Sequence, residues 1–241
     1  MKGMWVILGL TAVLLLTITG CGSFNVGPTQ TDTQSIELGD ADSAEVTVKM
    51  GVGELAVRGG AANLMDAEFT YNIEEWRPEV SYDIRQGEGQ LDIVQPENVT
   101  SINGIPDGNI NYKWDLAFAN DVPMTLAVDL GAGKSDLVLG DLHLTNLDVN
   151  VGVGETNLDL TGNWREDASI AVKGGVGSTT MKLPNNVGVR VTTETGLGSV
   201  DVYGLIRNGD VYTNEQYGQS DVQLDITVSG GVGAIRIDAE Q

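Results

Sequence analysis

Apolar and polar residues alternate along most of the chain after residue 43, and a Gly-x-Gly triplet recurs at fixed places in this alternation. Five residues before the first glycine of each triplet and six residues after it, the side chain is apolar. A period of two directs one set of side chains inward and the other to solvent, so each repeat predicts a strand, a glycine corner and a second strand. The triplet glycines are Gly51 and Gly53, Gly131 and Gly133, Gly152 and Gly154, Gly175 and Gly177, Gly196 and Gly198, and Gly231 and Gly233.

The spacing of the triplets indicates the architecture. Their first glycines between Gly131 and Gly196 are 21, 23 and 21 residues apart, which is too short for a propeller blade and fits one coil of a β-solenoid. We therefore predict an all-β fold, a β-solenoid of stacked Gly-x-Gly coils, with the glycines as structural turns. A phosphate-binding loop is the weaker alternative, because neither a dinucleotide fingerprint nor a Walker pattern is present. The middle residues are small or aliphatic, and we expect them to point into the core: Val52, Ala132, Val153, Val176, Leu197 and Val232.

Two intervals interrupt the repeat. Residues 67–73, 79–86 and 90–95 alternate as strands, and we expect an inserted β-meander, packed against the solenoid, within residues 67–113. Residues 96–111 are rich in Asn, Gly and Pro and predict a loop. Residues 205–220 predict an extra hairpin before the last coil. The solenoid domain as a whole is expected to cover residues 43–241.

The N-terminal segment differs from the rest. Residues 5–18 are apolar and uncharged, but a membrane-spanning helix needs about 20 such residues. The run predicts a cleavable signal sequence over residues 1–20. It ends in Ile18, Thr19, Gly20 and Cys21, a sequence that resembles the lipobox of bacterial lipoproteins. That resemblance implies cleavage before Cys21 and attachment of diacylglycerol and palmitate-type acyl chains to it. An ordinary secretory signal with an incidental cysteine is the alternative.

The sequence around Cys21 supports the lipid interpretation. Cys21 is the only cysteine, so an intramolecular disulfide cannot form even in an oxidising compartment. Residues 21–42 are polar and predict a tether between the lipid and the domain. The expected location is extracytoplasmic, at a membrane that holds the protein by the lipid on Cys21.

The charge balance restricts the partners. The formal net charge is −21, and removal of residues 1–20 takes away only Lys2, which leaves 12 basic and 34 acidic residues. Such acidity argues against binding of nucleic acid and against flat binding to an anionic bilayer. Acidic side chains also keep an exported β protein soluble, and that is the simpler interpretation. The other interpretation is that the acidic side chains bind a cation or a basic partner.

Several motifs together resemble a known family. They are Trp114-Asp115-Leu116, Asp121-Val122-Pro123, Gly131-Ala132-Gly133, Asp136-Leu137-Val138-Leu139, Gly152-Val153-Gly154 and Leu158-Asp159-Leu160. From residue 45 onward the chain is similar to the toast-rack family, to β-solenoid domains described as candidate adhesins, and to the C-terminal domain of LiaF-like proteins. The resemblance implies stacked β coils and a bacterial envelope location. It implies no catalytic residues, because the family offers none to carry over.

Candidate chemistry is sparse. His143 is the only histidine, and because it alternates with leucines we expect a surface side chain on a strand rather than a ligand or a base. A His and Cys zinc site is excluded by count, and no Gly-x-Ser-x-Gly elbow supports a serine hydrolase. Asp136, Asp159 and Asp201 occupy related repeat positions, which raises a calcium hypothesis. Only Gly230-Gly231-Val232-Gly233 matches the calcium-binding repeat, and only in part.

Aromatic residues allow two interpretations. They could form a sugar-stacking platform, or they could close the ends of the solenoid core, which we favour. The residues are Trp76, Trp114, Trp164, Tyr71, Tyr82 and Tyr112.

From the repeat, the lipobox and the sparse candidate chemistry together, we predict a noncatalytic, lipid-anchored interaction module without a cofactor, acting in adhesion or envelope stress sensing on an envelope protein or a glycan. The alternatives are a ligand-free scaffold or a calcium-binding surface protein, and a carboxylate-pair hydrolase has the least support.

Overall fold

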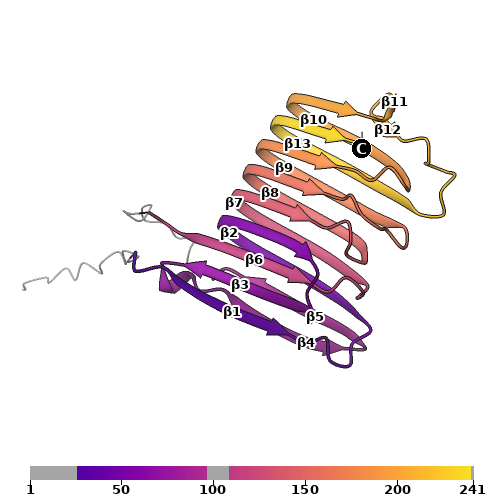
Figure 1. Ribbon diagram of the computed structural model, residues 1–241. Helices are drawn as coiled ribbons and strands as arrows, with labels where there is room; N and C mark the ends of the chain where they lie inside the picture. Colours follow the sequence, from indigo (N-terminus) through magenta and orange to yellow (C-terminus); the bar gives the residue numbers. More distant parts are fainter. Residues whose placement is uncertain (1–25, 97–108, 240–241) are drawn as a thin grey trace, which may run out of the picture.

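The computed structural model describes residues 26–96 and 109–239. These residues form one 13-stranded mixed sheet that winds into stacked coils (Figure 1). The predicted all-β solenoid is therefore confirmed. The elements in chain order are β1 (Gln30–Ile36), β2 (Ser43–Gly59), β3 (Met65–Tyr71), a 3-10 turn η1 (Glu74–Trp76), β4 (Glu79–Arg85), β5 (Glu88–Val94), β6 (Tyr112–Phe118), β7 (Met124–Val138), β8 (Leu144–Asp159), β9 (Ala168–Lys182), β10 (Gly188–Tyr203), β11 (Ile206–Asn208), β12 (Val211–Thr213) and β13 (Gln223–Asp238).

Each long strand bends at its Gly-x-Gly triplet and contributes to two layers. The triplets stack in register, since Gly53 pairs with Gly133, Gly133 with Gly154 and Gly154 with Gly177. Figure 1 shows the bends on one side of the stack and the longer connections on the other. We call these sides the Gly edge and the loop edge. The halves before the bend form the first layer, and the halves after it form the second layer.

The core lies between the two layers. The apolar residues five before the first glycine and six after it point inward, as the alternation predicts. Most of them are fully buried: Val46, Val57, Leu126, Leu137, Leu147, Leu158, Ile170, Met181, Val191, Ile226 and Ile237. Because every coil adds a matching pair of such residues, stacking the coils produces one continuous apolar core.

The order of the coils in the stack differs from their order in the chain. Strand β13, the last in sequence, lies between β9 and β10 and pairs in parallel with both. The predicted hairpin is confirmed as β11 and β12, and β12 pairs with β10 in the first layer. The hairpin therefore closes the end of the first layer, and the connection after it returns the chain to the gap between β9 and β10.

The inserted segment is not a β-meander packed against the solenoid. Its strands exist, but β3 pairs with β1 and β6, while β4 pairs only with β5. Strand β5 pairs in parallel with the first half of β2, and β6 pairs in parallel with the second half. The insertion therefore extends both layers of the solenoid, because the two halves of β2 offer two separate strand edges. Most of the predicted loop, at residues 97–108, lies outside the described residues.

The predicted tether is too long. Strand β1 lies within residues 21–42 and pairs antiparallel with β3, from Gln30 opposite Tyr71 to Ile36 opposite Met65. Its polar composition suits an edge strand that has one face in solvent. A linker has a similar polar composition, so the sequence alone does not distinguish the two. The signal sequence and the lipobox, including Cys21, lie outside the described residues. Within residues 26–96 and 109–239, no helix is long and apolar enough to cross a membrane.

Candidate interaction surfaces

The Gly edge is built by backbone stacking. At Gly133 and Gly154, φ is +145° and +149°, a region that side chains rarely adopt. A side chain on either residue would also collide with the carbonyl oxygen of the glycine in the preceding coil. Both requirements recur at Gly177 and Gly233, and the steric one at Gly198, so the second glycine of the triplet is what permits the coils to stack at this spacing.

The expectation that the middle residues fill the core is wrong for four of the six, which are exposed, whereas Val52 is partly buried and packs against the core. Val153, Val176, Val232 and Leu197 are 54%, 52%, 50% and 75% exposed. The reason is the direction of the bend: residues just before and after the triplet, such as Val151 and Thr156, are buried. The chain turns around them, which leaves the middle residue on the convex outer side.

These side chains form one continuous row. Register places them opposite each other in stack order as Val52, Ala132, Val153, Val176, Val232 and Leu197. We call this row the corner ladder. Large exposed apolar groups that line up over several coils differ from the scattered exposed residues that are normal on protein surfaces.

Charged residues border the corner ladder on both sides, two positions before the first glycine and one position after the second. Lysines and carboxylates are nearly balanced there, in contrast to the net charge of −21 for the whole chain. They are Lys49, Lys134 and Lys173 against Glu54, Asp129, Glu155 and Glu194. At these two positions the border of the ladder thus carries three lysines and four carboxylates, a formal charge of −1.

The first corner has a side-chain cap that the sequence pattern does not indicate. Strand β5 pairs with β2 up to Lys49, and β6 resumes the pairing at Glu54. Between these points, Oε1 of the buried Gln95 accepts hydrogen bonds from the backbone amides of Gly51 at 2.7 Å and Val52 at 3.1 Å. The side chain thus replaces the neighbouring strand at this corner.

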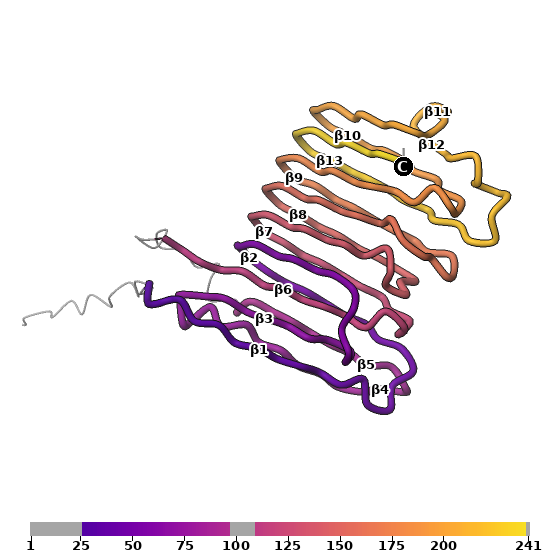
Figure 2. Tube along the Cα trace, in the orientation of Figure 1, coloured from indigo at the N-terminus to yellow at the C-terminus, as the bar shows by residue number. Residues whose placement is uncertain are grey.

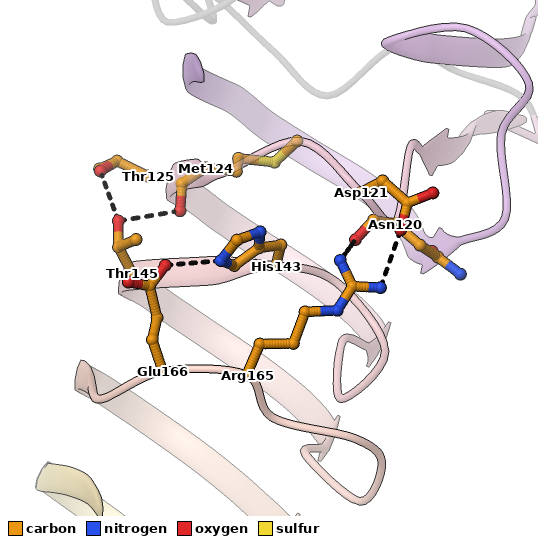
Figure 3. Close-up of polar contacts among 8 residues, drawn as sticks. All are labelled: Asn120, Asp121, Met124, Thr125, His143, Thr145, Arg165 and Glu166. Carbon is orange, nitrogen blue, oxygen red and sulfur yellow. Dashed lines mark hydrogen bonds and ion pairs between the residues drawn. The ribbon is translucent and has the colours of Figure 1, made fainter. Parts of the chain in front are cut away.

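His143 lies at the loop edge, in the turn before β8 and not within a strand (Figure 3). Its side chain is partly exposed, and its Nε2 lies 2.6 Å from Oε1 of Glu166. Nearby, the guanidinium of Arg165 donates to the carbonyl oxygen of Asn120 at 3.1 Å and to Oδ1 of Asp121 at 2.8 Å. These contacts join three successive loops.

The geometry around His143 does not favour catalysis. A nucleophile activated by histidine needs its hydroxyl or thiol within hydrogen-bond reach of the ring. Here Nε2 meets the carboxylate of Glu166, and no hydroxyl or thiol of the described residues bonds to the ring. The pair is on the surface, so its role is to connect loops. Thr145 strengthens the same edge by donating to the carbonyl oxygen of Met124.

The three aspartates of the calcium hypothesis do not stack on one another. Asp136 lies beside Ala56 and Asn157, Asp159 pairs with Lys182 at 3.6 Å, and Asp201 lies beside Arg236. Asp136 and Asp201 share a repeat position, but β8, β9 and β13 lie between their strands, and Asp159 lies two positions farther from its first glycine. Among the residues that the structure describes, no group of three or more His, Cys, Asp or Glu is placed to hold a metal ion. The stack of aspartates from which the calcium hypothesis was drawn is therefore not formed.

The aromatic residues do not form a sugar-stacking platform, because all of them are buried except Tyr82, which is partly buried. Trp76 and Trp114 flank Tyr112, with ring centroids 5.5 Å and 5.9 Å from it, and the hydroxyl of Tyr112 donates to the carbonyl oxygen of Trp76 at 2.6 Å. This cluster closes the core near β1 and β3, as the capping interpretation predicts. Trp164 instead lies in the β8–β9 connection and donates to the carbonyl oxygen of Leu160.

Comparison with known proteins decides the family. The family described as the N-terminal domain of toast_rack, DUF2154, matches residues 25–182. The chain belongs to the toast-rack family. A second family, described as cell wall-active antibiotics response LiaF, C-terminal, matches residues 133–237. The two matches overlap over residues 133–182, from the triplet of β7 to the end of β9.

A solved structure resembles the toast-rack chain over most of its length, and others match it with low TM-scores. A candidate cell adhesion protein from Clostridium sporogenes is 31% identical with a TM-score of 0.85, covering 88% of this chain and 100% of that one. A candidate adhesin from Parabacteroides merdae is 13% identical with a TM-score of 0.32, covering 88% and 81%. A candidate adhesin from Bacteroides fragilis is 11% identical with a TM-score of 0.33, covering 87% and 97%. No match was found among curated proteins.

Proposed function

We propose that this toast-rack protein is a lipoprotein anchored by Cys21, whose β-solenoid acts outside the cytoplasm as a noncatalytic interaction module of the cell envelope. The observation that carries the proposal is a lone cysteine at the end of a lipobox-like sequence, five residues before the first described residue of a toast-rack domain. A domain of this kind needs a means of attachment to act at a membrane, and lipid on Cys21 would supply it.

The relatives support an envelope role. The LiaF-like family that matches residues 133–237 is described by a cell wall-active antibiotics response, and the similar Clostridium sporogenes structure is a candidate cell adhesion protein. Both descriptions concern events at the cell surface. They support adhesion or sensing of envelope stress for this chain, and they name no substrate that the chain would transform.

The described surface favours binding over catalysis. An active site needs a nucleophile with a base, or paired carboxylates in a cleft, and His143 and Asp159 are instead paired with Glu166 and Lys182. Between the two partner classes, we favour an envelope protein over a glycan. The rings of Trp76 and Trp114 that could stack on a sugar are enclosed in the core.

The test uses the full chain in a bacterium that processes lipoproteins. The protein is cross-linked in living cells and recovered from the membrane fraction, with Cys21→Ser as the matched control. We expect recovery of a defined envelope protein with the native chain and its loss with Cys21→Ser. If the native chain recovers no envelope component above the Cys21→Ser control, the interaction module is contradicted. Recovery of envelope polysaccharide without protein would replace the protein partner by a glycan.

A further inference from the structure

The corner ladder and the start of the domain lie on the same side of the molecule. Gln30, the first residue of β1, pairs with Tyr71, which pairs with Tyr112 at the start of β6. The next residue of β6, Lys113, pairs with Glu54, directly after the first Gly-x-Gly triplet. The chain therefore enters the fold at the Gly edge, and Figure 2 shows the start of β1 on the side where the long strands bend.

The distance from the lipid is short. Cys21 lies five residues before Val26, the first described residue, and the amide of Gly27 already bonds to the carbonyl oxygen of Asn72 at 2.7 Å. Five fully extended residues span at most about 18 Å. Under the proposed anchoring by Cys21, Val26 must therefore lie within about 18 Å of the lipid, four residues before the chain enters the fold at Gln30.

The corner ladder has the chemistry of a surface that contacts lipid. Its side chains are aliphatic, and those of Val153, Val176, Val232 and Leu197 are half exposed or more. Three lysines nearly offset the four carboxylates along its border, so the ladder itself adds little to the repulsion that the acidic chain would meet at a membrane. Amphipathic edges of this kind insert their apolar groups at the boundary between headgroups and acyl chains.

We propose that the corner ladder rests on the lipid surface to which Cys21 is attached, so that the solenoid lies on its Gly edge and its loop edge points away from the membrane. This inference rests on the proposed anchoring. A second copy of the chain fits the ladder less well. A row one residue wide buries a few hundred Å² at most, whereas stable protein interfaces bury about 1,200–2,000 Å². A bilayer needs no such area, because the acyl chains supply the attachment.

The experiment measures how close two matched positions lie to lipid. Val176→Cys places a thiol on the ladder, and Asp141→Cys places one in an exposed turn of the loop edge. Each lipidated protein is labelled with an environment-sensitive dye at the new cysteine, since the thiol of Cys21 is blocked by its lipid. The proteins are then incorporated into phosphatidylcholine vesicles that contain lipid with a nitroxide on the acyl chain.

We expect several-fold stronger quenching at position 176 than at position 141. Equal quenching in proteins that do bind the vesicles would overturn the inference and leave the anchoring intact. Failure of the lipidated native chain to bind vesicles would overturn the anchoring, and the inference with it. A blue shift at position 176 in the lipid-free domain, together with a doubled mass in solution, would overturn the inference in favour of a second copy.

A charge variant gives an independent measurement. Val176→Asp puts a carboxylate in the middle of the ladder, where its outward direction leaves the core unchanged. With the dye at Val232→Cys, we expect Val176→Asp to reduce quenching at least about twofold, because inserting a charged group into the acyl region is costly. Binding to the vesicles should be unchanged, since the lipid on Cys21 is intact. Quenching that Val176→Asp leaves at the native level would overturn the inference.

Discussion

Gly177 stacks directly on Gly154, and the carbonyl oxygen of Gly154 occupies the space that a side chain at residue 177 would need. Gly177 also has a φ of +143°. We therefore expect Gly177→Ala to lower the free energy of unfolding by about 2–4 kcal/mol, through steric conflict and backbone strain together. Chemical denaturation measures the change.

Gly174 in the same strand is the matched control. A Cβ on Gly174 would meet Oγ1 of Thr179 at 3.5 Å, an ordinary contact, and its φ is not in the left-handed region. We expect Gly174→Ala to change stability by less than about 1 kcal/mol. Equal destabilisation by the two substitutions would contradict the account of the Gly edge.

The side chain of Gln95 should be needed at the first corner. Gln95→Leu has a similar volume and removes the oxygen that accepts from the amides of Gly51 and Val52. We expect a loss of about 1–3 kcal/mol, since backbone donors are left without a partner. Gln90→Leu, on the neighbouring strand β5, serves as the control and should change stability by less than about 0.5 kcal/mol. A thermal or urea unfolding series on the two variants distinguishes the capping role from a general effect of added apolar surface.

Truncation of two leucines at different repeat positions should have very different effects on stability. Leu158 is fully buried six residues after its first glycine, whereas Leu197 is the middle residue of its triplet and points to solvent. We expect Leu158→Ala to cost about 2–5 kcal/mol and Leu197→Ala to lie within about 0.5 kcal/mol of the native chain. Comparable losses in denaturant midpoint for both variants would show that the middle residues belong to the core after all.

Alkaline pH should destabilise the end of the solenoid that contains Tyr71. Burial, together with the hydrogen bond that its hydroxyl donates to Asp32, raises the pKa of Tyr71 from 10.0 to about 12. The unfolded chain therefore loses this proton first, and the stabilisation is complete below about pH 10 and is lost as the pH rises toward 12. The slope is at most about 1.4 kcal/mol per pH unit for this group. Between pH 9 and pH 11, the free energy of unfolding should fall less steeply with pH in Tyr71→Phe than in the native chain.

The fold could be predicted to the level of the coil because its signal is local. Residues such as Val46 and Leu126 recur at the same distance from a glycine, and a period of two has only one face that can be buried. Local patterns do not reveal which coils are neighbours. The flanks of β13 suit a place beside β9 or beside β10 equally well, and its insertion between them depends on the long connection through β11 and β12. That is a property of topology, which alternation does not encode.

The surface was harder to predict than the core. Val176 and Val232 are apolar, and their residue type alone suggests burial, but the bend between the layers places them outside. The direction of a side chain at a corner depends on φ at the neighbouring glycine and on the bend of the chain, neither of which composition gives. The capping role of Gln95 was missed for a related reason, because it joins residues 44 positions apart through a side chain. The capping role expected of the aromatic residues fits the cluster of Trp76, Tyr112 and Trp114, but not Trp164, which lies in the β8–β9 connection.

The most direct test of the central claim is the intact mass of the protein extracted from bacterial membranes, measured beside Cys21→Ser. The account predicts that the native chain begins at Cys21 and carries the added mass of diacylglycerol, with or without an acyl group on the new amino terminus. It also predicts that Cys21→Ser carries no lipid and leaves the membrane fraction. A native chain whose Cys21 is unmodified, or whose N-terminal sequence is retained, would contradict the claim that this toast-rack domain works as a lipid-anchored module.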